Sequence, residues 1–232
     1  MSDPIDGESF LKIVRPALET ADAGKLAQLV GTHWRPEQLR YMLRSDNVDV
    51  RRVAAVTLGL VGDTHCTPSL IRALRDMDEQ VNQMAEHGLW SIWFRSGKPQ
   101  ATQPFHQGVA LLTAENYQSA VDRFHEALRQ DPDFAEAFNQ CAIAHYFLGN
   151  WKESIADCDA TIRRVPHHFG AICGMGHCYA QLDDLHRALR CYKHALRINP
   201  RMTTLERAIN QLLSQQRDLN ASGEFLVDQF NN

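Results

Sequence analysis

The chain has 232 residues, enough for one long helical array or for two small domains. Hydrophobic residues make up 44% of it and charged residues 22%, which is ordinary for a globular protein. The formal net charge of -4 argues against nucleic acid or an anionic membrane as the main partner.

Export and membrane signals are not visible in the sequence. No apolar run approaches the roughly 20 residues of a membrane-spanning helix. The acidic N-terminus has neither the basic region nor the apolar core of a signal peptide. The six cysteines form no CxxC pair, so the sequence predicts a cytoplasmic protein with reduced thiols.

Two helices are expected at the start of the chain. The first begins near Glu8 with Phe10 on its apolar stripe, and Pro16 should kink or interrupt it. The second follows Gly24 and should stop at Gly31, because glycine is common just past a helix end.

From this point to Gly97 the sequence repeats with a period of 31 residues. Leu29-Val30-Gly31 recurs as Leu60-Val61-Gly62, and a proline precedes a short helix in each copy. These short helices are expected over residues 37–44 and 69–76.

Residues 49–59, followed by 68–76, resemble the HEAT family, in the short variant also found in bilin-lyase-type proteins. The resemblance implies stacked helix pairs over residues 1–98. It departs at Asn82, which stands where the first copy has Arg51.

Three aromatic residues end this repeated segment. Trp90 and Trp93 replace two glycines of the first copy, so the last helix is expected to run on toward Gly97. Together with Phe94 they are expected to form a domain junction that seals this half onto the next. The alternative is an exposed aromatic patch that binds a partner.

Residues 101–200 align with themselves in three rows of 34 residues. Small residues recur where two helices of one unit should approach closely, and large ones recur where they would fill the gap to the next unit. A proline recurs where it would end one unit, because it cannot continue a helix. The aligned columns include Gly108, Ala142 and Gly176; Phe124, Cys158 and Tyr192; and Pro132, Pro166 and Pro200.

These columns resemble the tetratricopeptide repeat (TPR), a helix–turn–helix unit, in three copies over residues 99–200. The expected fold is all-α: a right-handed α-solenoid of helix hairpins, with HEAT-like repeats, three TPR units and a C-terminal capping helix. His145 departs from the pattern, because its column otherwise holds Leu111 and Tyr179. This copy should pack less well or satisfy the imidazole internally.

Residues 201–232 are expected to form the capping helix and an apolar tail. Thr203-Thr-Leu-Glu206 is a capping-box pattern that opens a helix. The tail, residues 224–232, is rich in apolar side chains. We expect the tail to lie in the groove of its own molecule. Alternatively, it enters the groove of a second copy and so mediates self-association.

Catalytic and cofactor motifs are not found in the sequence, so no cofactor and no enzymatic activity are expected. There is no Walker A, GxSxG or HExxH motif. Cys173 and His177 share a helix face, as do Cys191 and His194, but zinc prefers four ligands at tetrahedral spacing. The sequence therefore predicts neither a metal site nor a catalytic Cys/His pair.

Four arginines could form a basic strip on the first half, namely Arg51, Arg52, Arg72 and Arg75. Acidic residues such as Asp76 and Asp78 are interleaved, so ion pairs between repeats are the favoured interpretation. Because HEAT-like repeats form a class of DNA glycosylases, the resemblance leaves nucleic-acid binding or base excision as an alternative function. A second alternative function is a bilin-lyase-like activity, in which a thiol such as Cys66 takes up a chromophore.

A stack of helix pairs leaves a concave groove that binds a peptide or a helix, so the chain is expected to be a non-catalytic adaptor for another protein. By resemblance, the first helix of each pair lines this groove. Chaperone-binding TPR domains hold a C-terminal carboxylate there with Lys, Arg and Asn, but of these positions only Asn139 would fit. The residues expected to contact the partner are Phe105, Val109, Leu112, Asn139, Ile143, Tyr146, Cys173, His177, Gln181 and Arg207. Alternatively, the first three are covered by the HEAT-like half.

Overall fold

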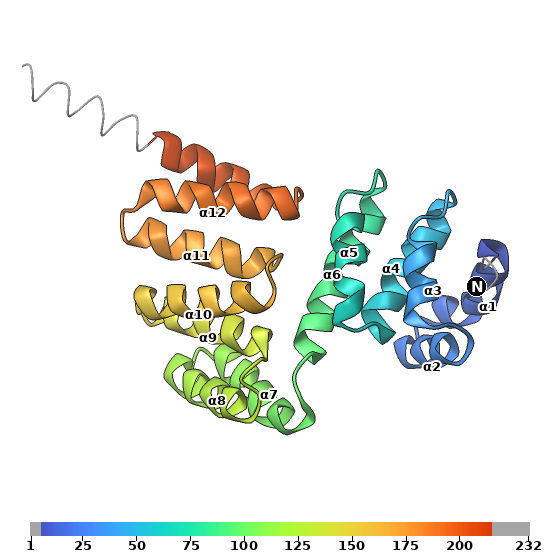
Figure 1. Ribbon diagram of the computed structural model, residues 1–232, viewed down its shortest axis with the longest axis horizontal. Coiled ribbons are helices and arrows are strands. Elements are labelled where there is room, and N and C mark those ends of the chain that lie inside the picture. The colour runs from blue at the N-terminus through green and yellow to red at the C-terminus, as the bar shows by residue number, and fades with distance from the viewer. Residues whose placement is uncertain (1–5, 215–232) are drawn as a thin grey trace, which may run out of the picture. The chain divides into compact units, whose positions relative to one another are not determined.

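The computed structural model describes residues 6–214, and every regular element in this range is a helix (Figure 1). The expected all-α fold class is therefore confirmed for this part of the chain. The contacts divide the chain into two compact units, Met1–Pro99 and Gln100–Asn232. Among the described helices, none has both the length and the apolar character that a bilayer crossing would need.

The N-terminal unit consists of helices that pack in pairs. Helix α1 packs against α2 and α4, α4 packs along α6, and the short helices α3 and α5 cover α4 and α6. The helices are α1 (Gly7–Glu19), α2 (Ala23–His33), α3 (Pro36–Met42), α4 (Val48–Val61), α5 (Thr67–Ala73) and α6 (Glu79–Arg95).

Local chemistry sets where these helices begin. The side chains of Asp6, Asp22, Asn47 and Asp78 each accept a hydrogen bond from a backbone N–H in the first turn of a helix. Such caps satisfy donors that have no partner within the helix.

The expected helix end at Gly31 is wrong, and Pro16 does not interrupt the first helix, although a kink there stays a prediction. Pro16 lies inside α1, on its exposed side, where water can satisfy the carbonyl that the proline ring leaves without a donor. Gly31 lies inside α2, since one glycine costs a helix only about 1 kcal/mol. The helix ends instead at His33, close to the restricted backbone that precedes Pro36.

The two copies of the 31-residue repeat use different side chains for the same contact. Arg51 donates to the carbonyl oxygen of Ser45 at 2.9 Å, and Asn82 donates to that of Asp76, also at 2.9 Å. Both side chains satisfy the backbone just after the preceding short helix. This explains the departure at Asn82, while membership of the HEAT family stays a prediction.

The end of α6 carries the aromatic residues of the expected junction. The helix continues to Arg95, close to Gly97, as the loss of the two glycines predicts. Trp93 is buried and meets the ring of Trp90 edge-on, with the ring centroids 5.2 Å apart, and Phe94 is half-buried. That these residues join two halves of the chain stays a prediction.

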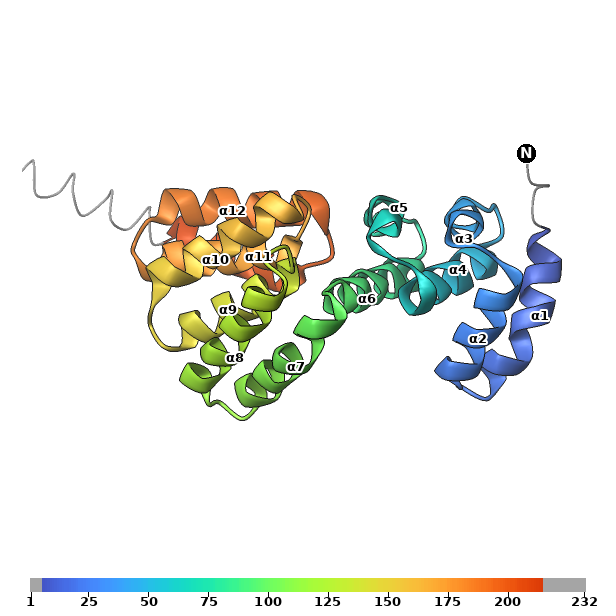
Figure 2. The ribbon, with the colours of Figure 1, turned by 60° about the horizontal axis from the view of Figure 1, so that its bottom comes forward.

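The C-terminal unit is a stack of helix hairpins (Figures 1 and 2), followed by a helix over residues 203–214. Pro132, Pro166 and Pro200 each come just after the second helix of a hairpin, as expected. The hairpins are α7 (Pro99–Thr113) with α8 (Tyr117–Gln130), α9 (Ala135–Phe147) with α10 (Trp151–Arg164), and α11 (Phe169–Gln181) with α12 (Leu185–Ile198).

The column of small residues lies where the two helices of a hairpin touch. A Cβ on Gly108 would lie 2.6 Å from the ring of Phe124, and one on Gly176 would lie 2.6 Å from the ring of Tyr192. In the middle hairpin the Ser154 hydroxyl donates to the Ala142 carbonyl oxygen at 2.7 Å. The expected close approach is confirmed, because no larger residue fits these positions.

A buried carboxylate ties the second repeat to the third. Glu136, fully buried in the first turn of α9, accepts hydrogen bonds from the side-chain amides of Asn139 (3.0 Å) and Gln140 (2.7 Å). His168, the N-cap of α11, accepts from the backbone N–H of Ala171 through Nδ1, so its proton lies on Nε2 and is donated to Glu136 at 3.0 Å. The network fixes the starts of α9 and α11 against each other.

The helix over residues 203–214 buries Leu205 and Leu212 and leaves Arg207 exposed. This is the arrangement expected of a capping helix, with one face on the stack and one face in water. The tail, residues 224–232, lies outside the described residues.

Candidate functional site

A cavity of about 210 Å³ lies in the C-terminal unit, where α9 and α11 face each other. Four of the residues expected to contact a partner line it: Asn139, Ile143, Tyr146 and His177. The remaining lining residues are small or apolar for the most part: Ala142, Phe147, Ser154, Cys158, Gly170 and Gly174.

The shape of the cavity follows from helical spacing. Asn139, Ile143 and Tyr146 are four and three residues apart on α9, so they share one face of that helix. Gly170 and Gly174 share a face of α11 in the same way, and neither fills the space in front of it. Large residues on one helix opposite glycines on the other therefore leave an apolar recess.

Polar groups at this site are tied to one another. The Cys173 sulfur lies 3.3 Å from His177 Nε2, and His177 Nδ1 lies 2.7 Å from the Tyr192 hydroxyl. Burial lowers the pKa of His177 and raises that of Cys173 to about 12, so both groups are neutral at pH 7. Gln181 donates from its side-chain amide to the Tyr146 hydroxyl at 3.4 Å, a contact that links α11 to α9.

The cavity is unsuited to a carboxylate clamp. Asn139 is 3% exposed and its amide group donates to Glu136. Among the described residues that line the cavity there is no lysine and no arginine. The recess therefore offers apolar contact rather than a charge that would hold a free carboxylate.

Phe105 is a correction to the expected binding set. Its side chain is fully buried, and its ring packs against those of Phe134 (4.6 Å between centroids) and Phe124 (6.0 Å). It is a core residue of the first hairpin and has no surface left for a partner. Val109 and Leu112 on α7 are half-buried, Arg207 is exposed, and none of these three lines the cavity.

The two glycines that line the α11 side of the cavity were not expected from the sequence. Gly170 and Gly174 are four residues apart in the first helix of the third repeat, a position where no turn requires glycine. A pair of glycines at helical spacing on the side that faces the groove is the signal that could have indicated a recess.

A second cavity, of about 390 Å³, lies in the N-terminal unit. Arg51 at its edge forms an ion pair with Asp76 at 2.8 Å, and beside it Arg52 pairs with Asp78 at 2.6 Å. These two contacts are ion pairs of the kind that the sequence predicts between the repeats. The cavity lining also includes Arg40, Arg44, Arg72 and Arg75.

Cys66, the thiol named for chromophore uptake, is fully buried in the N-terminal unit. Burial also raises the pKa of this thiol, so it is a weak nucleophile at neutral pH. The geometry gives a bulky chromophore no access to the sulfur.

The C-terminal unit is similar to known repeat proteins. The sequence model of the tetratricopeptide repeat family matches residues 170–202. A TPR repeat-containing protein of Rhizobium etli is 30% identical over 94 residues, which are 40% of this chain and 46% of that protein. The chain thus spans less than half of that relative.

Solved structures show the same fold. The Sgt2 TPR domain from Aspergillus fumigatus matches 54% of this chain and 84% of its own, with a TM-score of 0.51 and 16% identity. The first TPR of Spaghetti (RPAP3), bound to an HSP90 peptide, matches 51% of this chain and 94% of its own, with a TM-score of 0.50 and 17% identity. With three hairpins in a 34-residue register, these matches identify the C-terminal half of the chain as a tetratricopeptide-repeat array.

Proposed function

We propose that the chain is a non-catalytic adaptor that binds a segment of a partner protein between α9 and α11. The observation that carries this proposal is the apolar recess of about 210 Å³ on the face formed by the first helices of two successive repeats. The likeness to a TPR solved with an HSP90 peptide supports peptide binding as a use of this fold.

The lining chemistry defines the kind of segment. An apolar side chain that enters the recess would be removed from water, which contributes about 1.5–3 kcal/mol for a residue such as leucine or phenylalanine. Tyr146 and Gln181 offer polar groups close by for the backbone or a polar neighbour. An amphipathic helix or a peptide with apolar anchors satisfies both requirements.

A peptide-display selection against the full chain tests this proposal. Selected peptides should carry apolar anchors, and Tyr146→Ala, which removes one wall of the recess, should weaken them by at least about tenfold, or 1.4 kcal/mol. Met77→Ala is the control, because Met77 is a fully exposed apolar residue outside the recess. Equal binding to wild type and Tyr146→Ala would contradict the proposal.

The arginine-lined cavity of the N-terminal unit favours a second candidate, the binding of a polyanion. Arg44, Arg72 and Arg75 pair with no described acidic side chain, so they remain available to phosphate or carboxylate groups. Binding of labelled duplex DNA should fall steeply with salt and should weaken in Arg72→Ala, but not in Arg163→Ala on the exposed side of α10. Absence of salt-dependent binding would remove this candidate.

A further inference from the structure

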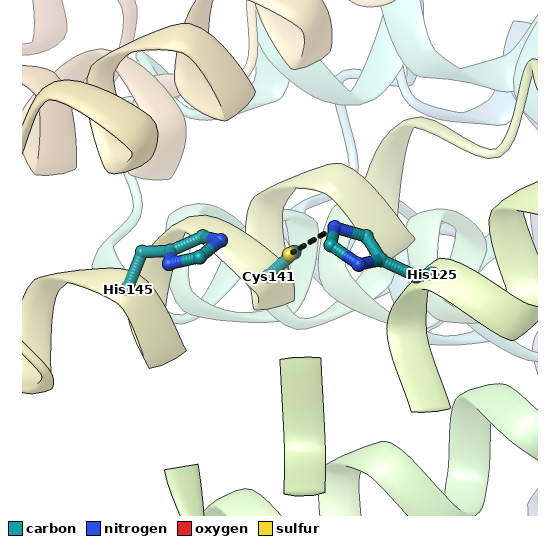
Figure 3. Close-up of side chains that lie close together, drawn as sticks. All are labelled: His125, Cys141 and His145. Atoms are coloured by element: carbon teal, nitrogen blue, oxygen red, sulfur yellow. Dashed lines mark hydrogen bonds between the residues drawn. The ribbon is translucent and has the colours of Figure 1, made fainter. Parts of the chain in front are cut away.

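Three side chains with metal-ligating atoms meet on the C-terminal unit, away from the recess. His125 comes from α8, and Cys141 and His145 lie four residues apart on α9. Their ligand atoms all lie within 4.8 Å of one another, and Cys141 Sγ is 3.8 Å from His125 Nε2. Figure 3 shows the two imidazole rings on either side of the Cys141 sulfur.

An acidic side chain of α10 lies beside this cluster. The Oδ2 atom of Asp157 lies 3.9 Å from Nε2 of His145. Burial, followed by the nearby Asp157 carboxylate, raises the pKa of the Cys141 thiol well above its usual range. Burial also raises the pKa of Asp157, and Cys141, His145 and His125 oppose this shift. The Asp157 carboxylate and the Cys141 thiol therefore lie within electrostatic reach of each other.

The separations approach those of a tetrahedral zinc site. Zinc–nitrogen bonds of about 2.05 Å and zinc–sulfur bonds of about 2.3 Å put neighbouring ligand atoms about 3.5 Å apart. The distance of 3.8 Å between Cys141 Sγ and His125 Nε2 exceeds this only slightly, and the ligand atoms of the three clustered residues all lie within 4.8 Å of one another. One cysteine, two histidines and one carboxylate are also the donor types that zinc takes.

His145 gives an independent reason to expect a ligand. Its Nδ1 atom is buried and has no hydrogen-bond partner among the described residues, and its Nε2 atom is beyond hydrogen-bond distance of Asp157. The equivalent positions of the other repeats hold Leu111 and Tyr179, so packing alone does not call for an imidazole. Burying one without partners costs free energy, which a metal–nitrogen bond would offset.

We propose that His125, Cys141 and His145, with the Asp157 carboxylate beside them, form a binding site for Zn²⁺ or a divalent transition-metal ion of similar ligand preference. On binding, the Cys141 thiol loses its proton to solvent and its sulfur bonds to the metal as a thiolate. His125 is exposed and provides the side from which an ion enters. The bound ion cross-links α8 to α9, and so joins the first repeat to the second.

The other close cysteine–histidine pair of this unit serves as an internal comparison. Cys173 and His177 also lie four residues apart, with sulfur and nitrogen 3.3 Å apart. The second nitrogen of His177 is engaged with Tyr192. No histidine or carboxylate joins this pair in a described cluster of three, so it should not hold zinc tightly.

Zinc titration of the reduced, chelator-treated full chain tests the proposal. Calorimetry with ZnCl₂ should show one tight equivalent, and zinc should raise the melting temperature. His125→Ala, which removes an exposed ligand, should weaken binding by at least 100-fold, beyond the roughly 10–100-fold typical of residues that only support a ligand. Cys173→Ala should bind zinc like the wild type.

Cobalt provides a readout of the sulfur ligand. Co²⁺ in place of zinc should give a thiolate-to-metal charge-transfer band that is absent from Cys141→Ala and from His125→Ala. Circular dichroism of His125→Ala without metal checks that the variant is folded. Failure to bind one zinc tightly, or tight binding unchanged in folded His125→Ala, would overturn the proposal; so would loss of binding in Cys173→Ala alone.

Discussion

Each helix hairpin of the C-terminal unit turns at a residue with left-handed backbone. Glu115, Gly149 and Asp183 have φ values of 58°, 76° and 58°, and they are 34 positions apart. Only glycine adopts this conformation without steric cost, which for other residues is about 1–2 kcal/mol. The first and third turns are therefore strained, and the second is not.

Exchange of residues at these turns should change stability in opposite directions. Gly149→Ala should lower the free energy of unfolding by about 1 kcal/mol, because a Cβ there meets no atom within 4 Å and only the backbone conformation is affected. Glu115→Gly should raise it by up to about 1 kcal/mol. Urea titrations of both variants measure the two changes, and a stabilising Gly149→Ala would contradict the argument.

Two glycines of α11 form a second matched pair. Gly176→Ala would place a Cβ 2.6 Å from the Tyr192 ring and should destabilise the protein by about 1–3 kcal/mol. Gly174→Ala would place a Cβ 3.5 Å from the Cys158 sulfur, an ordinary contact, and should stabilise the helix by about 0.5–1 kcal/mol. Thermal melts of the two variants should shift in opposite directions, and a shared direction would refute the packing argument.

The packing role of a single residue was predictable from the sequence where residues of the same type stand at the equivalent positions of the other repeats. Gly108 and Gly176 follow from their column because the same helix contact recurs in each hairpin. Phe105 was wrongly expected to contact a partner, because its position in the repeat does not reveal that Phe124 and Phe134 enclose its ring. The proposed metal site was not predicted, because His125 and Cys141 come from two different helices and the three ligands form no short motif.

At the scale of elements, ion pairs hold neighbouring helices of the N-terminal unit together. The hydrogen bond from Arg52 lowers the pKa of Asp78 to about 2. Burial alone would raise the pKa of Asp76, but the hydrogen bonds from Arg51 and from the backbone lower it below its usual value. Both carboxylates therefore favour the folded state only while they are ionised.

Acid should weaken this unit in a defined range of pH. An unfolded aspartate has a pKa of about 3.9, so the stabilisation is complete above that value and is lost as the pH falls toward 2. Asp78→Asn keeps a cap for α6 but removes the charge, and its stability should depend less on pH between 5 and 2. Urea titrations at several pH values measure this, and identical pH profiles for variant and wild type would exclude the ion pair as the cause.

Helix bounds show what a sequence pattern cannot decide. Neither an interruption at Pro16 nor the end expected at Gly31 occurs, since a single weak residue is tolerated in a helix whose apolar face is buried. The ends of α8, α10 and α12 before prolines were predictable, because there the pattern and the missing N–H agree.

At the scale of the whole molecule, the apolar tail suggests a ligand supplied by the chain itself. Residues 224–232 lie outside the described residues, and their sequence holds Phe225, Leu226, Val227 and Phe230. We expect a chain that ends at Gly223 to bind a selected apolar peptide more tightly, or to lose a dimer that the full chain forms. Calorimetry and sedimentation compare the two chains, and no change in either quantity would exclude the tail as an occupant of the recess.

Mapping of a selected peptide onto the protein by backbone amide chemical shifts tests the adaptor proposal most directly. Shift changes should be concentrated on α9 and α11, around Ile143 and Gly174, and should be smaller in Tyr146→Ala at the same peptide concentration. Changes confined to α8, or to the arginine-lined cavity of the N-terminal unit, would contradict a binding site in the recess.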